Sequence, residues 1–385
     1  SGNAPGSLEI TDANSNYYEA YTNLIASNFA KTEHGYTGTG HSVAVIDTGI
    51  DLNHSHFGPD QDGNGMADRI VFSKDFTFET DNTANDEHGH GTHVAGIIGS
   101  SDPSLEGIAP DCSIIALQGL TASGRGSSSG IENALKWCVE NALKYNITAV
   151  NMSLGGSTNY AQEHAGPYND EITALAQLGV IVVSASGNQG NSKAVSYPSA
   201  EKFSLSIGSV HHGASHGTPD KISSFSNRHP DLTTVFAPGH SIPAAWINEQ
   251  TKIISGTSMA SPVIAGTVVL IQEAALDIIG RKLSFNEVSF LLKDKGTKIF
   301  DGGQEYLRVN VEKMVKEIVN LQKPGFHKVD LQAGDVLEKN FGFADINYQK
   351  NGSVDNNAGL TLVGTSASDL LNGSSSADHI LGGGG

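Results

Sequence analysis

The stretch "SVAVIDTGI" at residues 42–50 joins a run of apolar, mostly β-branched residues to a carboxylate and a glycine turn. A short apolar run without polar alternation is typical of a strand buried on both faces of a sheet. Asp47 stands where this strand ends. Because functional groups gather at the carboxyl ends of parallel strands, we expect Asp47 to lie at a functional edge of the sheet.

Further apolar runs, separated by helical patterns, extend this arrangement along the chain. The runs cover residues 112–117, 147–154, 179–186 and 203–210, and the helical patterns cover 93–99, 129–145 and 170–178. Such alternation predicts an α/β fold, with a central and mainly parallel sheet and helices on both faces. A helix from Ser258 is apolar on nearly every side, so we expect it to be central. Residues 284–296 predict one more helix.

Composition limits the partners and the setting. The chain has 385 residues and a formal charge of −18, which argues against nucleic acid or an anionic membrane as main partner. No apolar run approaches the roughly 18 residues of a membrane span, so none is expected. The start, "SGNAPGSLEI", has neither an initiator Met nor a secretory signal pattern, and suggests a mature or engineered fragment.

The two cysteines allow two interpretations. Cys138 shares an apolar helical face with Ile131 and Leu135, and Cys112 precedes a buried run. This setting favours two reduced core residues over a single disulfide, and neither cysteine has a motif that indicates reactivity.

Three segments carry candidates for catalysis: "VAVIDTGI" with Asp47, "HGHGTHVAG" with His90, and "SGTSMASP" with Ser258. Each alone is weak evidence, but the order Asp, His, Ser is one known order of the acyl-transfer triad. A serine hydroxyl needs an imidazole to take its proton, and the imidazole needs a carboxylate to fix its tautomer. Asn188 in "SASGNQG" follows a strand and could direct its amide at an oxyanion.

With these segments the chain closely resembles the subtilisin-like serine proteases, or subtilases. The likeness covers about residues 36–275, with these motifs in family order: "GYTGTGHSVAVIDTGID", "HGHGTHVAGII", "GIAPDCSIIAL", "VNMSLGG", "SASGNQG", "FAPG" and "SGTSMASPVIAG". The resemblance implies a subtilisin-like three-layer fold and serine endopeptidase activity. It implies that Asp47 orients the imidazole, that His90 is the general base and acid, and that Ser258 is the nucleophile. It also implies that Asn188 and the Ser258 N–H form the oxyanion hole.

The resemblance also implies how substrate binds. Ser153, Leu154 and Gly155 would pair with an extended peptide, and Ala185, Ser186 and Gly187 would line the first specificity pocket. Protein or peptide substrates, and the chain's own propeptide, are the implied partners of a secreted monomer. Three features depart from the family pattern. Val263 replaces a histidine that is common in the family, and residues 99–110 are shorter than a loop that holds calcium in many secreted members. The segment 188–198 is also short, so the depth of the specificity pocket stays open.

The loop "DQDGNGMADRI" at residues 60–70 has the opening spacing of an EF-hand loop. It predicts a structural Ca²⁺ site with ligands from Asp60, Asp62, Asn64, Asp68 and the carbonyl of Met66. The bidentate Glu of a full EF-hand is missing, so another group must complete the shell. The alternative is a solvated acidic turn.

The C-terminal part differs in character. Leu362, Leu371 and Ile380 recur every nine residues, as do Asp369 and Asp378, a spacing that resembles truncated RTX-type calcium-binding nonapeptide repeats. We expect a peptidase domain at 1–320, a linker or small β appendage at 321–360, and the start of the repeats at 361–385, forming a short β or disordered extension. Such repeats suggest export through a type I system.

The sequence allows other interpretations of its site and function. His88, His90 and His93 with Asp86 and Glu87 could form a metal cluster, but the spacing fits neither H-E-x-x-H nor a usual zinc pattern. The favoured function is a secreted, calcium-stabilised serine endopeptidase. The alternatives are a dedicated processing protease for one precursor, or a non-catalytic calcium-dependent binding protein on a protease fold. The complete triad and Asn188 argue against the last.

Overall fold

The computed structural model describes residues 11–77, 82–214 and 217–321, together with the backbone of 361–364 and 379–382. The chain divides into one compact unit from Ser1 to Ile318 and a second from Val319 to Gly385, and each is described by itself.

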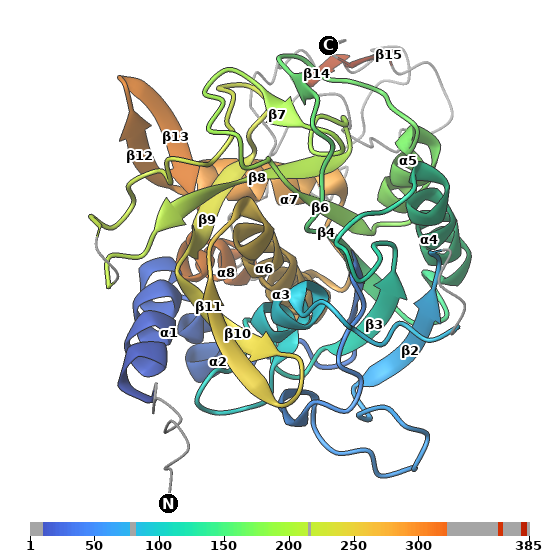
Figure 1. Ribbon diagram of the computed structural model, residues 1–385. Coiled ribbons are helices and arrows are strands. Elements are labelled where there is room, and N and C mark those ends of the chain that lie inside the picture. Colours follow the sequence, from blue (N-terminus) through green and yellow to red (C-terminus); the bar gives the residue numbers. More distant parts are fainter. Residues whose placement is uncertain (1–10, 78–81, 215–216, 322–360, 365–378, 383–385) are drawn as a thin grey trace, which may run out of the picture. The chain divides into compact units, whose positions relative to one another are not determined.

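A nine-stranded sheet forms the centre of the first unit (Figure 1). Its order is β12-β13-β9-β8-β6-β4-β1-β3-β2, and every neighbouring pair is parallel except β12 and β13. The strands are β1 (Ser42–Asp47), β2 (Ile70–Asp75), β3 (Ser113–Gln118), β4 (Ile147–Met152), β6 (Ile181–Ala185), β8 (Ser204–His211), β9 (Val235–His240), β12 (Thr297–Asp301) and β13 (Gln304–Arg308). The buried strands thus form the predicted, mainly parallel sheet.

Helices pack on both faces of this sheet. Ala44 and Ile46 of β1 belong to one buried cluster with residues of α4 (Ser128–Asn141) and α5 (Asn169–Gln177). Because side chains alternate along a strand, the intervening residues of β1 face the other side. There α3 (His90–Gly99) and α6 (Thr257–Ile279) contact β1 and each other. The three-layer α/β prediction is therefore confirmed.

The helix α6 corrects one expectation. Its 23 residues are long and apolar enough, by length and composition, to cross a membrane, although no such run was expected from the sequence. Interruptions such as Ser261 and Pro262 hide this in the sequence, but the average hydropathy is high. Most of its apolar window, 72%, is buried inside the protein, which is typical of the core helix of a globular domain.

Several elements were not predicted from the sequence. They include α1 (Thr11–Ile25), α2 (Asn28–His34), η1 (Ser55–Phe57), α8 (Val311–Asn320), the small pair β5 (Asn159–Tyr160) with β7 (Val195–Ser196), the hairpin β10 (Ile242–Trp246) with β11 (Gln250–Ile254), and strands β2, β9, β12 and β13. The predicted helix near 284–296 is α7 (Phe285–Asp294), and it begins with a capping box between Ser284 and Glu287.

The cysteines are both free and buried, which confirms the prediction of reduced core residues. Burial raises the pKa of Cys112 to about 11, so its thiol stays protonated and unreactive near neutral pH.

The second unit contains one described pair of strands. β14 (Thr361–Gly364) and β15 (His379–Gly382) are parallel, with Leu362 opposite Ile380. The predicted linker at 322–360 and the repeat residues 365–378 and 383–385 lie outside the described residues.

Candidate active site

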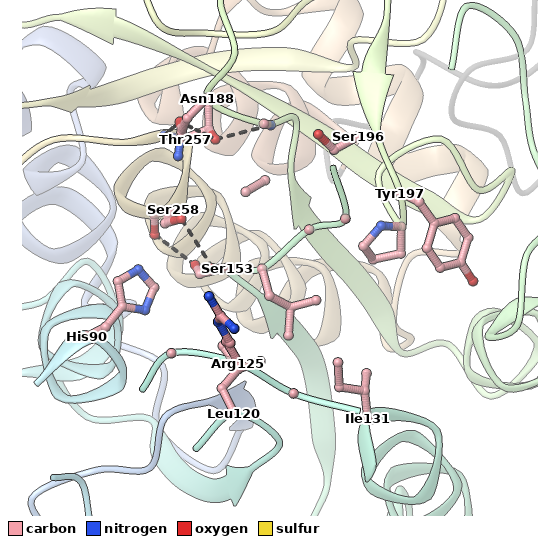
Figure 2. Close-up of a pocket in the computed structure, with 18 of the residues that line it drawn as sticks. His90, Leu120, Arg125, Ile131, Ser153, Asn188, Ser196, Tyr197, Thr257 and Ser258 are labelled. Carbon is pink, nitrogen blue, oxygen red and sulfur yellow. Dashed lines mark hydrogen bonds between the residues drawn. The ribbon is translucent and has the colours of Figure 1, made fainter. Parts of the chain in front are cut away.

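A cleft of about 740 Å³ lies at the carboxyl ends of the central strands. Its lining brings together His90, Asn188 and Ser258, which are far apart in the sequence (Figure 2). The parallel topology explains this, because β4 and β6 deliver their following loops to one edge and α3 and α6 begin there. Three of the four predicted catalytic residues thus share one cavity, and Asp47 lies behind it.

Asp47 and His90 form the best-defined contact of the site. Asp47 ends β1 and is fully buried, and its Oδ1 lies 2.6 Å from His90 Nδ1. Since a carboxylate only accepts, His90 Nδ1 must donate, and in the neutral imidazole this leaves Nε2 without a proton and able to accept one. Thr48 N–H donates to the same oxygen at 2.8 Å and fixes the carboxylate. This is the arrangement of an oriented general base.

The neighbours of His90 stabilise its protonated, positively charged form. Burial alone would lower the pKa of His90, but the negative charge of Asp47, its hydrogen bond and the charge of Asp86 outweigh this, and the pKa is raised above its usual value. An imidazolium formed during a reaction is therefore stabilised in place.

Asp86 holds the turn that carries His90. Its Oδ1 accepts from Thr48 Oγ1 and from the backbone N–H groups of His88 and Gly89, all at 2.9 Å. Its Oδ2 accepts from the backbone N–H and the hydroxyl of Thr92. Gly89 has φ of +100°, which explains why the helix begins at His90 and not at the predicted residue 93. From the sequence, Asp86 was considered only for the alternative metal cluster, although its place four residues before His90 was visible.

Ser258 is the second residue of α6, where backbone N–H groups lack intrahelical acceptors. Its side chain is half-buried, and its hydroxyl donates to the carbonyl oxygen of Ser153 at 3.2 Å. The hydroxyl of Ser153 donates in turn to the carbonyl oxygen of Ser258 at 2.7 Å. Among the described residues, no hydrogen bond joins Ser258 to His90. Catalytic hydrogen bonds are often loose before substrate binds, so this resting contact is compatible with a nucleophile.

Asn188 is oriented by the residue next to Ser258. Its Oδ1 accepts from both the backbone N–H and the hydroxyl of Thr257, each at 2.9 Å. Two donors on one atom identify that atom as the oxygen, so the NH₂ group must point the other way. Figure 2 shows Asn188 and Thr257 joined in this way at one end of the cleft. Since this NH₂ group has no hydrogen-bond partner among the described residues, it offers a side-chain donor beside the Ser258 N–H.

Position 187, which precedes Asn188, has no room for a side chain and is occupied by glycine. Its φ is +109°, and a Cβ there would overlap the hydroxyl of Ser196 and the amide of Asn227. The Gly187 N–H donates to Thr257 Oγ1 at 3.2 Å. The backbone around the donor amide is therefore fixed on both sides.

The predicted peptide-binding edge lies in the same cleft. Ser153, Leu154 and Gly155 follow β4 and line the cavity. Within the described part of the chain, the backbone groups of Leu154 and Gly155 take part in no backbone–backbone hydrogen bond, so they are available to an added strand.

The residues predicted for the first specificity pocket divide into two groups. Ala185 and Gly187 line the cleft. Ser186 is fully buried, and its hydroxyl donates to the carbonyl oxygen of Asn227, so its side chain faces away from the cleft. The reason is strand alternation, which turns every second side chain to the other side.

The acidic loop brings its three predicted carboxylate ligands together. Carboxylate oxygens of Asp60, Asp62 and Asp68 all lie within 4.8 Å of one another, and all three residues are exposed. The Asn64 side-chain oxygen accepts from Met66 N–H at 2.8 Å, which leaves its second lone pair for a cation. Positive φ values at Gly63 and Gly65 allow the chain to wrap around Asp60. Converging carboxylates suit a hard cation such as Ca²⁺.

The alternative zinc cluster is not assembled. His93 is fully buried, and its Nε2 lies 3.1 Å and 3.0 Å from the carbonyl oxygens of Ile242 and Lys252. Burial lowers the pKa of His93 to about 3, so it is a neutral structural residue. In the part of the chain that the structure describes, the three aspartates are the one group of carboxylates, imidazoles or thiols that could hold a metal.

Comparisons with known proteins agree with this site. The model of the Subtilase family matches residues 38–307. Proteinase T of Parengyodontium album is 35% identical over 232 residues, which are 60% of this chain and 70% of that protein. The cuticle-degrading serine protease of Arthrobotrys oligospora is 35% identical over 60% of this chain. The major intracellular serine protease of Bacillus subtilis is 31% identical over 66% of this chain and 75% of its own length.

The chain spans only part of some relatives, including 51% of the Arthrobotrys oligospora protease. Among solved structures, a cold adapted subtilisin-like serine proteinase is 31% identical, with a TM-score of 0.58 over 72% of this chain and 90% of that one. The fold is therefore subtilisin-like, and the matched family segment includes Asp47, His90, Asn188 and Ser258. Sequence, fold and relatives agree that this chain belongs to the subtilase family.

Proposed function

We propose that the chain is a serine endopeptidase that hydrolyses peptide bonds through Asp47, His90 and Ser258. The observation that carries the proposal is the 2.6 Å contact from the buried Asp47 carboxylate to His90 Nδ1, in a cleft that also contains Ser258 and Asn188. Serine acyl transfer needs a fixed imidazole tautomer, a nucleophile and an oxyanion donor at one place. The relatives named as serine proteases support the same reaction.

The reaction follows from the roles of these groups. The Ser258 hydroxyl turns from Ser153 toward His90 Nε2, loses its proton to that nitrogen and forms a bond to the substrate carbonyl carbon. Asn188 Nδ2 and the Ser258 N–H donate to the oxyanion. His90 then protonates the leaving amine, which breaks the peptide bond and leaves an acyl ester on Ser258. Water, deprotonated by His90, hydrolyses the ester and restores the enzyme.

A Ca²⁺ ion in the acidic loop is the second part of the proposal. Asp60, Asp62 and Asp68 would supply carboxylate oxygens and Met66 its carbonyl, and the Asn64 side-chain oxygen would use the lone pair that does not accept from Met66 N–H. The ion would neutralise three clustered negative charges and stabilise the folded state by its preferential binding. No step of the reaction involves it.

We also propose that residues 361–385 begin a calcium-binding repeat array behind a peptidase domain at 1–320. The support is the parallel pairing of Leu362 with Ile380, since 18 residues correspond to two nonapeptides. We infer from these repeats that the chain is exported. The relatives alone do not indicate export, because one of them is named as intracellular. Co-expression with a type I exporter, with and without residues 361–385, tests export: equal secretion of both forms would contradict it.

Activity is tested with an unfolded protein substrate and with the variants Ser258→Ala and Ser261→Ala. Ser261 lies on α6 as Ser258 does, but its buried hydroxyl donates to Asn151 and lies outside the cleft lining. Loss of hydrolysis in Ser258→Ala, with activity retained in Ser261→Ala, is the expected result. Residual hydrolysis by pure Ser258→Ala at the wild-type rate would contradict the proposal. Sedimentation of the active protein tests the expected monomer.

A further inference from the structure

One cation in the cleft has no assigned role. Arg125 is exposed and lines the cavity, and Figure 2 shows its guanidinium directed into the cleft below Ser153 and Ser258. A turn fixes its backbone, because the Arg125 carbonyl oxygen accepts from Thr121 N–H at 2.8 Å and from the Thr121 hydroxyl at 2.9 Å. The side chain therefore projects from a defined point on the cleft wall.

The neighbours of Arg125 show which part of the cleft it faces. A Cβ on Gly124 would lie 3.5 Å from His88 Nε2, and one on Gly126 would lie 2.7 Å from Leu120 Cδ2. The short segment thus runs from the histidine end of the cleft to an apolar hollow that contains Leu120. Arg125 stands between the two.

The guanidinium of Arg125 is unusual among the arginines of this chain. The chain has five arginines. Four are engaged: Arg69 with the carbonyl oxygen of Cys112, Arg228 with Asp301, Arg281 with Glu287, and Arg308 with Asp220. Among the described residues, the side chain of Arg125 has no hydrogen bond or ion pair. In a protein of formal charge −18, the one arginine that finds no partner among the described residues faces the cleft.

The rest of the lining does not neutralise this charge. Among the described residues that line the cleft, none is Asp or Glu, and the other titratable nitrogen groups are His88 and His90. Arg125 is therefore the one permanently charged group in the described lining. A carboxylate that enters the cleft meets a planar donor group that can bind both its oxygens.

We propose that Arg125 forms a subsite selective for an acidic side chain at the second or third residue before the scissile bond. The inference rests on the proposed peptidase function and names the substrate class of that site. An extended peptide on the Ser153–Gly155 edge advances about 3.3 Å per residue from Ser258. Its second and third residues therefore lie between the catalytic end and the Leu120 hollow, where Arg125 projects.

The test uses internally quenched octapeptides with Leu before the scissile bond and Ala elsewhere. Each carries Glu, Gln or Lys at the second or the third position before that bond, and mass analysis confirms the cleaved bond. The readout is the ratio of kcat/KM for the Glu peptide to that for its isosteric Gln partner. This ratio cancels defects that affect all peptides alike.

At one or both positions the wild type should prefer Glu over Gln by about five- to tenfold, as expected for one charge-assisted contact in a partly hydrated site. Arg125→Gln should bring the ratio to about one, Arg125→Lys should retain part of it, and Arg125→Glu should favour Lys. Because the contact is exposed, the preference should shrink at about 1 M salt. The control Lys313→Glu makes the same charge change as Arg125→Glu, but on α8 and outside the cleft lining. It should keep the wild-type ratio.

Two results would overturn the subsite: a wild-type ratio near or below one at both positions, or a ratio above one that Arg125→Gln leaves unchanged. An equal loss of the Glu preference in Lys313→Glu would assign the preference to the electrostatic field of the whole protein, and would also contradict the subsite. The failure of the proposed function looks different. In that case no peptide is cleaved and a fluorophosphonate does not label Ser258, and the subsite falls with it.

Discussion

The hydroxyl of Ser258 donates to the carbonyl oxygen of Ser153, 3.2 Å away, while Ser153 donates its own hydroxyl to the carbonyl oxygen of Ser258. This reciprocal pair ties the start of α6 to the end of β4, which also begins the predicted peptide-binding edge. The proposed nucleophile is therefore held at rest by the segment that would pair with the substrate. A rotation about the Ser258 Cα–Cβ bond is sufficient to redirect the hydroxyl toward His90.

The oxyanion donor provides the first prediction. Asn188→Ala should lower kcat by about 100- to 1,000-fold with little change in KM, because the donor acts mainly on the transition state. That magnitude is carried over from subtilisin, a relative in which the corresponding asparagine was removed. Steady-state kinetics on one peptide measures it.

The contact with Thr257 supplies a matched pair of controls. Thr257→Val removes one of the two donors that orient the Asn188 amide, whereas Thr257→Ser keeps the hydroxyl. The valine variant should lose less kcat than Asn188→Ala, and the serine variant should resemble the wild type. An Asn188→Ala enzyme with wild-type kcat would remove Asn188 from the oxyanion hole.

The carboxylate of Asp86 should influence the pH dependence. Its charge contributes to the raised pKa of His90, which must be neutral to act as a base. In Asp86→Asn the imidazolium loses that support, so the pKa falls and the acidic limb of the kcat/KM profile moves to lower pH. An unchanged or higher apparent pKa would contradict this role.

The same substitution should also cost stability. An Asn side chain keeps one acceptor oxygen but places an NH₂ group where Asp86 Oδ2 accepts from Thr92. Leaving buried donors unpaired costs about 1–3 kcal/mol. Urea unfolding measures this loss separately from the pH profile.

Calcium should act on stability and leave the chemistry unchanged. Chelation should lower the unfolding temperature, and a free Ca²⁺ concentration of 100 times Kd corresponds to about 2.7 kcal/mol. Asp62→Ala should reduce this response, while Asp231→Ala, at an exposed acid outside the cluster, should keep it. Below the unfolding temperature, kcat should not change. A calcium response that survives in Asp62→Ala would place the ion elsewhere.

Buried histidines should make the protein sensitive to acid. Burial lowers the pKa of His93 to about 3, while an unfolded chain takes up the proton near pH 6.5. Between these values the unfolded state binds more protons, so the free energy of unfolding falls as the pH falls. Urea titrations at several pH values should show a smaller slope for His93→Gln than for the wild type. The exposed His34→Gln is the control, and an unchanged slope in His93→Gln would contradict the argument.

The sequence was most informative where function depends on short local motifs. Asp47, His90 and Ser258 each stand in a segment whose chemistry and chain order are visible without coordinates, and the apolar runs predicted the sheet. What it could not show were contacts between distant segments, such as Thr257 with Asn188 or Ser153 with Ser258. These depend on how the ends of β4, β6 and α6 meet.

Arg125 was missed for a different reason. The segment "TASGRGSSSG" at 121–130 reads as an ordinary polar turn, and its importance depends on the cleft beside it. A cation flanked by two glycines, after an apolar strand, was the available signal. The burial of α6 was predicted correctly, but its continuous apolar length was underestimated from the sequence.

The proposed mechanism requires Ser258 to be a nucleophile activated by His90. Labelling of the folded, calcium-loaded protein with a fluorophosphonate, followed by peptide mass mapping, measures this reactivity. One adduct is expected, on Ser258, and it should form much more slowly in His90→Ala. No adduct in demonstrably folded protein, or an adduct on another serine, would contradict the mechanism.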